Sequence, residues 1–369
     1  MGKRLVSMLV AGLLLSACGA APEQGGTSEG GQTSATTAAN GDRPAVCLVS
    51  GFGGLDDQAF NQSAYEGLQA IAEELSIDFT VNEPQDVSDY QPSYDAMVQE
   101  GCGLLIGMSY LQSSTAAKVA EDNPDLHVAL VDSGFFTEQN EPVTLDNGRP
   151  LEFDTVQASF LAGYAASAVS KTRTIGTFGG TQEPPVIAFM DGFAKGANQW
   201  NLDHPDDPVH VLGWDPEQKD GTFAGTYEDI AQGKTLTTAM FGQGADIVMP
   251  VAGSVGQGAA AAAKEKEGTF VIWVDSDGAL SAPEYKDVIL TSVIKDVGAS
   301  VKEAVRDEVE GKFTANPYIG TLENGGVRLS PFHDHDGLVD QAVKDRLAEL
   351  QQQIITGDLK LESDYSPKS

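Results

Sequence analysis

The sequence predicts an α/β fold with two similar lobes. From Val46 onward, short apolar runs rich in β-branched residues alternate with longer segments of helical period, as in βαβ units whose helices cover both faces of a parallel sheet. This alternation occurs in two successive series of similar length. The chain from this point has about 325 residues, which is long for one domain and enough for two.

The first series covers residues 46–145. Its expected strands are residues 46–50, 79–82, 104–107, 128–132 and 143–145, and its expected helices are residues 61–75, 90–99 and 113–121. The first helix has the clearest signal, because Ala64, Leu68, Ile71 and Leu75 recur at intervals of three and four residues. This half of the chain is therefore expected to form one parallel sheet with its own helices.

The second series begins after an expected helix at residues 155–170. Its expected strands are residues 174–178, 209–213, 247–251 and 270–274, and its expected helices are residues 187–200, 227–241 and 257–267. A further strand (288–294) and helix (297–310) follow, and the chain closes with an amphipathic helix at residues 339–355. The two series are similar enough in size to predict two similar lobes.

The N-terminus resembles a bacterial lipoprotein signal. Two basic residues precede an apolar stretch (5–15) that is too short to span a membrane, and the small pair Ser16-Ala17 precedes Cys18. By this resemblance, residues 1–18 are a signal peptide whose cleavage leaves an acylated Cys18, so the protein is extracytoplasmic and anchored to the cell membrane. The alternative is an ordinary secretory signal with an incidental cysteine.

Composition predicts a linker after the signal peptide, and net charge argues against binding to nucleic acid. Residues 19–43 are almost entirely Gly, Ser, Thr, Ala, Gln and Glu without apolar periodicity, which predicts a flexible linker. The formal net charge of −32 argues against nucleic acid as a partner, since phosphate contacts require clustered Lys and Arg. The same acidity is typical of a solubilising surface and says little about a small ligand.

Two cysteines remain once Cys18 is assigned to lipid. Cys47 lies in the first expected strand, and Cys102 directly precedes the apolar run of the third. In an exported protein such a pair indicates a disulfide if both strands belong to one parallel sheet. Two buried free thiols are the alternative.

Polar residues follow several of the expected strands. Residues 50–54 (SGFGG) follow the first strand and Asp132 ends the fourth, while Gly253 and Asp275 occupy similar places in the second series. In open α/β sheets, ligands bind at the carboxyl ends of the strands, where loops and helix N-termini meet. These positions are therefore the first candidates for a ligand site.

A family resemblance appears at the same places. The stretches that carry it are residues 53–62 (GGLDDQAFNQ), 192–196 (GFAKG), 244–248 (GADIV) with 252–253 (AG), and 274–277 (VDSD) followed by 291–295 (TSVIK). In this order they resemble the basic membrane protein family, the nucleoside-binding lipoproteins of bacterial ABC importers similar to purine nucleoside receptor A. Ala59, Tyr65 and Trp273 depart from the usual family residues Ser, Trp and Gly.

The resemblance implies a type I periplasmic-binding-protein-like fold, with two Rossmann-like lobes joined by a hinge of crossing strands. The first lobe would comprise residues 44–153 plus 284–314, and the second residues 154–283 plus 315–369. The implied function is capture of a nucleoside, with a purine expected, by domain closure, followed by delivery to an ABC permease with its ATPase. No cofactor is implied, and the protein is expected to act as a monomer.

The resemblance and the strand-end positions together indicate nine ligand-binding residues. They are Asp57, Phe60, Asn61, Tyr65, Asp132, Phe189, Gly253, Asp275 and Lys295. By the resemblance, Asp275 contacts a sugar with Lys295 beside it, and Asn61 contacts base or sugar. Alternatively, Asp275 and Asn61 cap helices and Lys295 lies on a solvated face.

The remaining candidates supply loop geometry and stacking surface. Asp57 and Phe60 would hold the glycine-rich loop, Gly253 would offer its backbone, and Tyr65 and Phe189 are the aromatics expected to stack on a base. Trp214 is a further stacking candidate. Asp132 is a second polar candidate in the first lobe.

Enzymatic readings find little support in the sequence. No serine elbow or cysteine nucleophile motif accompanies the five histidines, and the cluster 333–335 (HDH) lies in a polar loop, so neither catalysis nor a metal site is expected. The catalytic alternative is a nucleoside-processing or glycosidase-like enzyme that uses Asp56 with Asp57 or Asp275 with Asp277. The non-catalytic alternative is a receptor for a sugar or another small polar metabolite, in uptake or signalling.

Overall fold

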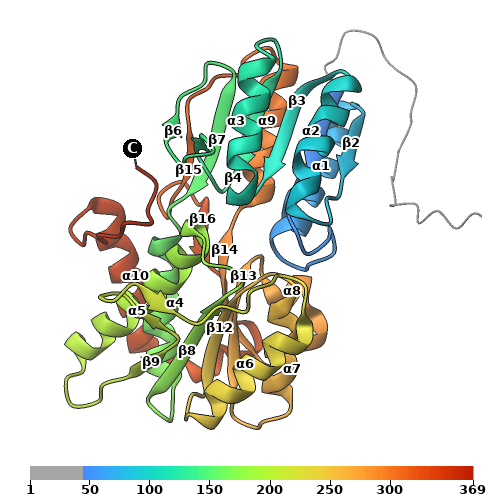
Figure 1. Ribbon diagram of the computed structural model, residues 1–369. Helices are drawn as coiled ribbons and strands as arrows, with labels where there is room; N and C mark the ends of the chain where they lie inside the picture. The colour runs from blue at the N-terminus through green and yellow to red at the C-terminus, as the bar shows by residue number, and fades with distance from the viewer. Residues whose placement is uncertain (1–44, 369) are drawn as a thin grey trace, which may run out of the picture. The chain divides into compact units, whose positions relative to one another are not determined.

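The computed structural model describes residues 45–368, which belong to one compact unit. The expected signal peptide (1–18), linker (19–43) and lipidated Cys18 lie outside the described residues. Within them, the two predicted α/β lobes are present, and each is built around one mainly parallel sheet (Figure 1).

The first lobe contains an all-parallel sheet. In spatial order, its described strands are β15 (Tyr318–Gly320), β7 (Gly148–Phe153), β4 (His127–Val131), β3 (Cys102–Met108), β1 (Ala45–Val49) and β2 (Phe79–Asn82). Helices α1 (Phe60–Leu75) and α9 (Val297–Val309) cover one face, and α2 (Tyr90–Gln99) and α3 (Ser113–Asp122) cover the other. Both faces are therefore buried, which explains the continuous apolar runs of the strands.

The second lobe repeats this arrangement. In spatial order, its described strands are β16 (Val327–Leu329), β14 (Ile289–Lys295), β13 (Phe270–Asp275), β12 (Ile247–Val251), β8 (Thr174–Gly179) and β9 (His210–Leu212). Helices α4 (Thr155–Val169), α5 (Pro184–Asp203) and α10 (Gln341–Thr356) lie on one face, and α6 (Ile230–Gly242) and α7 (Val255–Lys264) on the other (Figure 1). By position in the two sheets, β13 corresponds to β4 and β8 to β1.

Short elements complete the described chain. They are the strand pairs β5 (Phe135–Phe136) with β6 (Pro142–Val143) and β10 (Trp214–Asp215) with β11 (Asp220–Gly221), the helix α8 (Gly278–Ser281), and 3₁₀ turns at Val87–Asp89, Tyr110–Gln112, Pro283–Tyr285 and His333–Leu338.

Among the described residues, the chain passes between the lobes at Asp154, at Asp296 and through residues 321–326. Backbone hydrogen bonds tie these segments together, because the Asp154 N–H donates to the Gly320 carbonyl (2.8 Å) and the Asp296 N–H to the Gly326 carbonyl (2.8 Å). The crossing segments therefore form one hydrogen-bonded hinge.

Two of the expected lobe boundaries are wrong at particular strands. Residues 284–314 were expected in the first lobe, yet β14 pairs with β13 in the second sheet, so the crossing falls between β14 and α9. Residues 315–369 were expected in the second lobe, yet β15 pairs with β7 in the first sheet. The reason is that the chain leaves each sheet immediately after a strand, instead of keeping every strand with its following helix.

The expected strand at residues 143–145 is also wrong, since the sheet strand is β7. Arg149 and Pro150 interrupt the apolar pattern of this strand in the sequence. Arg149 is nevertheless buried, because its guanidinium pairs with Glu303 (2.5 Å) and Asp307 (2.7 Å) on α9. A paired arginine can be buried where a lone charge cannot.

The structure joins Cys47 and Cys102 in a disulfide, with their Cα atoms 5.9 Å apart. Cys47 lies in β1 and Cys102 begins the neighbouring parallel strand β3. This is the first of the two alternatives that the sequence left open.

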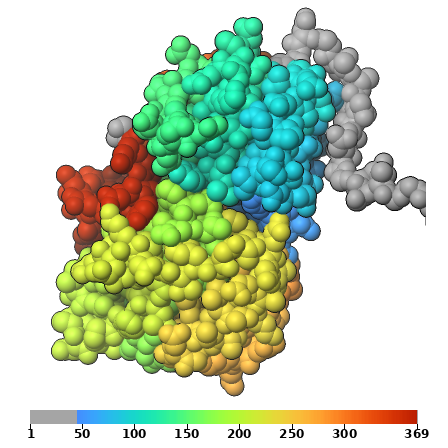
Figure 2. Space-filling model, in the orientation of Figure 1, coloured from blue at the N-terminus to red at the C-terminus, as the bar shows by residue number. Residues whose placement is uncertain are grey.

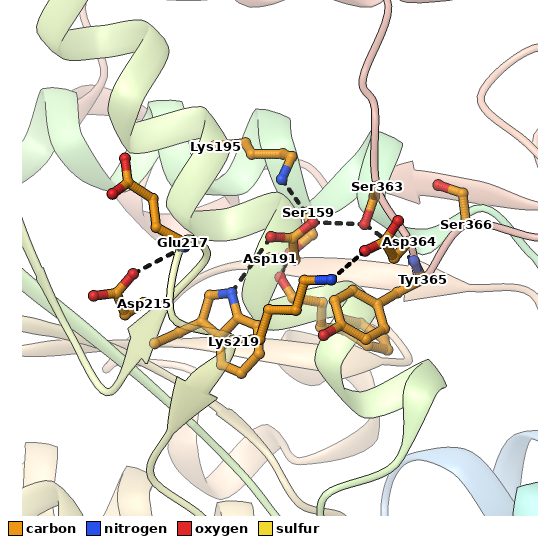
Figure 3. Close-up of polar contacts among 12 residues, drawn as sticks. Ser159, Asp191, Lys195, Asp215, Glu217, Lys219, Ser363, Asp364, Tyr365 and Ser366 are labelled. Carbon is orange, nitrogen blue, oxygen red and sulfur yellow. Dashed lines mark hydrogen bonds and ion pairs between the residues drawn. The ribbon is translucent and has the colours of Figure 1, made fainter.

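The segment after α10 packs on the second lobe (Figure 3). Ser363 Oγ donates to Asp191 Oδ2 (2.6 Å), Lys219 pairs with Asp364 (2.5 Å), and the Tyr365 ring lies edge-on to Trp214. Further along, Ser366 Oγ donates to the hinge residue Asp154 (2.7 Å). In residues 45–368, no helix has the length and apolar character needed to cross a membrane.

Candidate ligand-binding cleft

A cleft lies between the two lobes, at the carboxyl ends of their strands. Seven of the nine predicted ligand residues line it, namely Asp57, Phe60, Asp132, Phe189, Gly253, Asp275 and Lys295. Asn61 and Tyr65 are not among the lining residues. Both lobes contribute, as expected for ligands that bind at strand ends in open α/β sheets.

Lys295 is the central charge of the cleft. Its side chain is only 3% exposed, and Nζ lies 2.7 Å from Asp132 Oδ2 and 3.0 Å from Asp275 Oδ1. Burial alone lowers the pKa of Lys295, but the two carboxylates outweigh burial and raise this pKa above its ordinary value. Lys295 therefore stays protonated, and it is not the solvated surface lysine of the alternative reading.

The two aspartates occupy corresponding places in the two sheets. Asp132 directly follows β4 and Asp275 ends β13, and both have a left-handed backbone, with φ of 69° and 67°. Burial raises the pKa of Asp275, Lys295 lowers it, and Asp132 raises it. Asp275 Oδ1 is fully buried and lies against the Lys295 ammonium, so the ion pair with Lys295 is what stabilises the charged form of this carboxylate.

Aromatic rings surround the ammonium group of Lys295. Nζ lies 4.7 Å from the ring centre of Phe60 and 5.1 Å from that of Phe189, with Phe153 at 6.0 Å. Phe60 comes from the first lobe and Phe189 from the second, and both line the cleft. Cation–π attraction helps to hold the ammonium, and the rings offer apolar surface to a flat ligand.

Asp57 organises the start of α1. Oδ1 accepts hydrogen bonds from the N–H groups of Ala59 and Gln62, and Oδ2 accepts one from the N–H of Asn61, at 2.9–3.1 Å. These bonds satisfy donors that the first turn of a helix leaves free. Burial raises the pKa of Asp57 to about 6, although these backbone hydrogen bonds oppose the shift.

Asn61 does not offer its amide to the cleft. Its Oδ1 accepts from the Gly51 N–H (2.9 Å) and its Nδ2 donates to the Phe52 carbonyl (2.8 Å). The predicted direct ligand contact is therefore corrected to a supporting one, because both polar atoms of the side chain fix the loop after β1. Phe52 itself lines the cleft.

Tyr65 was expected to stack on a base, and the structure places it elsewhere. Its ring packs edge-on against Phe79, with centroids 6.2 Å apart. Tyr65 lies five positions after Phe60 in the helix, which turns its side chain roughly 140° away from that of Phe60. Only Phe60 of this pair faces the cleft.

Several lining residues were missed by the sequence analysis. They include Ser109, Tyr110, Leu111, Glu183, Pro185, Val186 and Tyr227. Tyr227 was assigned to a helix, but α6 begins three residues later, at Ile230. Glu183 follows β8, which corresponds to β1, so the strand-end rule applied to β8 would have found it.

Glu183 and Tyr227 form a polar cluster with Thr181. Glu183 is 5% exposed, and its Oε1 accepts hydrogen bonds from the hydroxyl groups of Tyr227 (2.8 Å) and Thr181. Burial raises the pKa of Glu183, whereas these two hydrogen bonds lower it. The cluster adds a second carboxylate site to the cleft, distinct from the Lys295 site.

The lobes also touch beside the cleft. The backbone carbonyl of Gln58 in the first lobe accepts hydrogen bonds from Trp273 Nε1 (3.2 Å), Ser276 Oγ (2.7 Å) and Ser281 Oγ (2.9 Å) of the second. Ser254 Oγ donates to the Gly53 carbonyl (3.1 Å). Figure 2 shows the segment after β1, in blue, against the yellow and orange residues of the second lobe. The structure therefore represents a closed arrangement.

The charges of the cleft limit its chemistry. Among the described residues, the ionisable carboxylates and amine that line it are Asp57, Asp132, Glu183, Asp275 and Lys295. This excess of acidic groups favours a neutral ligand rich in hydroxyl and N–H donors, and it disfavours phosphorylated ligands.

Neither carboxylate pair of the enzyme alternative has both members in the cleft. Asp57 caps α1, while Asp277 accepts a bond from the Ala279 N–H and contacts His333 (2.8 Å), and Asp277 does not line the cleft. Residues 45–368 contain no cluster of three or more His, Cys, Asp or Glu arranged to hold a metal ion.

Comparison with known proteins agrees with this geometry. A family described as "ABC transporter substrate-binding protein PnrA-like" matches residues 45–359. The chain is 33% identical over 340 residues to the nucleoside-binding protein BmpA of an ABC transporter in Lactococcus lactis subsp. cremoris, covering 86% of this chain and 89% of that protein. It is 31% identical over 297 residues to basic membrane protein A1 of Borrelia garinii subsp. bavariensis, covering 80% and 79%.

Solved structures share the fold. A solute-binding protein of an ABC transporter from Aeropyrum pernix K1 superposes with a TM-score of 0.78 at 23% identity, over 88% of this chain and 94% of that one. A D-allose-bound solute-binding protein from Actinobacillus succinogenes 130z gives 0.59 at 12% identity, over 80% and 100%. The predicted type I periplasmic-binding-protein fold is confirmed.

The family match covers almost all of the described residues, and the relatives agree with it along most of their own length. Proteins of this family bind solutes outside the cytoplasm for ABC transporters and are not enzymes. This chain belongs to the PnrA-like family of ABC transporter substrate-binding proteins.

Proposed function

We propose that this protein captures a nucleoside in the cleft and delivers it to an ABC permease. The observation that carries the proposal is the buried Lys295, held between Asp132 and Asp275 beside the rings of Phe60 and Phe189. Carboxylate oxygens accept hydrogen bonds from ribose hydroxyls, Lys295 donates to ribose oxygens, and the rings contact the flat base. The Lactococcus relative named as nucleoside-binding supports this ligand class.

Capture works by closure of the two lobes around the hinge. A ligand that binds both Asp132 and Asp275 stabilises the closed state over the open one, because only the closed state brings these two side chains together. The closed form then docks on the permease, whose ATPase drives release. The protein acts as a monomer held at the cell membrane by lipid on Cys18.

Titration calorimetry of residues 45–369 with adenosine, guanosine, inosine, uridine and ribose tests the ligand class. We expect micromolar or tighter binding of at least one nucleoside, and at least a tenfold loss in Asp275→Asn. Binding of ribose or another sugar alone would move the function to carbohydrate uptake. Labelling of the full-length chain with radioactive palmitate, compared with Cys18→Ala, tests the lipid anchor.

A further inference from the structure

The cleft has two polar clusters that lie at different strands. The Lys295 cluster gathers at the ends of β14, β13 and β4, whereas Thr181, Glu183 and Tyr227 gather beyond β8 and before α6. In the second sheet β12 lies between β13 and β8, so these two strands are about 10 Å apart. This separation is large enough for the two clusters to contact different ends of one small ligand.

Glu183 has an unused acceptor. Both hydrogen bonds to its carboxylate, from the hydroxyl groups of Tyr227 and Thr181, are made to Oε1, and no described residue donates to Oε2. Glu183 lines the cleft, and Oε2 is not among the fully buried polar atoms without a partner. Oε2 is thus held in a fixed position with its lone pairs available to a ligand.

Glu183 also lacks a counter-charge of its own. Among the described residues no lysine, arginine or histidine forms an ion pair with it, and the nearby Lys295 already pairs with Asp132 and Asp275. A buried carboxylate with an unpaired oxygen destabilises a protein unless some donor meets it. A ligand donor is the partner that this geometry lacks.

We infer that Glu183 is a specificity-determining residue, whose Oε2 accepts a hydrogen bond from an N–H group on the edge of the bound base. This rests on the proposed function, in which the sugar occupies the Lys295 cluster and the base extends toward β8. Tyr227 and Thr181 position Glu183 by holding Oε1. A base edge that presents only acceptors is rejected, since two oxygens would then meet without a proton between them.

Matched nucleoside pairs test the inference. Guanosine and inosine differ by the 2-amino group, adenosine and purine riboside by the 6-amino group, and inosine and 1-methylinosine by the N1 proton. A hydrogen bond to a charged acceptor predicts that the donor-bearing member of at least one pair binds the wild type about tenfold tighter or more. Glu183→Gln turns an N–H donor toward the ligand and should reduce that ratio to below threefold or invert it.

Controls separate this inference from the proposed function. Asp275→Asn should weaken every nucleoside while the ratios within pairs remain, because it acts at the sugar end. Tyr227→Phe should reduce the ratio in part, and it replaces Glu183→Gln as the test variant if the latter does not fold. Wild-type binding of nucleosides with ratios that Glu183→Gln leaves unchanged overturns the inference alone. Failure of the wild type to bind any nucleoside overturns both.

Discussion

Lys295 Nζ lies 2.7 Å from Asp132 Oδ2, which joins a lysine at the end of a second-lobe strand to an aspartate of the first lobe. The same ammonium lies 3.0 Å from Asp275 of its own lobe. The ion pair between Lys295 and Asp132 is therefore specific to the closed state. Lys295 and Asp275 belong to the same lobe and can stay paired when the lobes separate, whereas Lys295 reaches Asp132 only when the lobes meet.

Lys295→Met is expected to destabilise the protein and abolish ligand binding. The substitution keeps apolar contact with Phe60 and Phe189 but leaves two buried carboxylates facing each other without a cation. Breaking a buried ion pair in this way costs about 3 to 5 kcal/mol of unfolding free energy. Urea denaturation measures the loss, with Lys302→Met on the exposed surface of α9 as the control. Equal stability of both variants would contradict the central role of Lys295.

The raised pKa of Asp57 predicts that the free energy of unfolding depends on pH. Its pKa is about 6 in the folded protein, above the ordinary 3.8, so the folded state holds this proton more tightly than the unfolded state does. The contribution of Asp57 to unfolding free energy is therefore greatest below pH 4 and falls as the pH rises from 4 to 6, by up to about 3 kcal/mol. Above pH 6 it is constant.

The difference in unfolding free energy between wild type and Asp57→Asn isolates this effect, since asparagine does not titrate in this range. We expect the difference to move against the wild type as the pH rises from 4 to 6, and to level off above. A difference that instead moves in favour of the wild type over this interval would show that the pKa of Asp57 is lowered.

The strand-end rule and the family motifs together predict most of the Lys295 site from the sequence. Asp132, Gly253 and Asp275 follow buried strands, and the sequence shows where those strands end. The prediction of Lys295 depends on the family motif alone, because the flanking sequence does not show whether this lysine is buried or exposed. The partners that bury it, Asp132 and Phe189, are more than a hundred residues away.

Other features depended on tertiary contacts that local sequence does not reveal. Strand β7 contains Arg149, which is compatible with a buried sheet only because α9 brings Glu303 and Asp307 to it. Tyr65 and Phe60 are both aromatic residues in the first half of α1, and they differ in which side of the helix their rings project from. Tyr227 fits a helical pattern, yet its hydroxyl bonds to Glu183 before the helix begins.

Removal of residues 361–369 is expected to lower stability by about 1 to 3 kcal/mol. Leu361 and Tyr365 pack against the core, and loss of Ser363 removes a 2.6 Å hydrogen bond from the buried Asp191 (Figure 3). Lys219→Ala removes only the exposed pair with Asp364 and should change stability by less than about 1 kcal/mol. Thermal unfolding followed by circular dichroism compares the two variants. If Lys219→Ala is as damaging as the truncation, the exposed ion pair rather than the packing holds this segment.

The interlobe hydrogen bonds to the Gln58 carbonyl are expected to increase the affinity for the ligand. Ser276 and Ser281 of the second lobe both donate to it, and neither residue lines the cleft. The double variant Ser276→Ala/Ser281→Ala should therefore shift the lobes toward the open state without altering the ligand contacts. Since hydrogen bonds of this kind contribute about 0.5 to 1.5 kcal/mol each, loss of both should lower the affinity roughly 5- to 150-fold.

Small-angle X-ray scattering together with calorimetry checks this prediction. The ligand-free double variant should have a larger radius of gyration than the wild type, and saturating ligand should bring the two to the same value, because a ligand in excess restores the closed population. Ser88→Ala, on the exposed 3₁₀ turn of the first lobe, is the matched control and should change neither quantity. An unchanged affinity would contradict the prediction, since a smaller closed population must weaken the binding of any ligand that prefers the closed state.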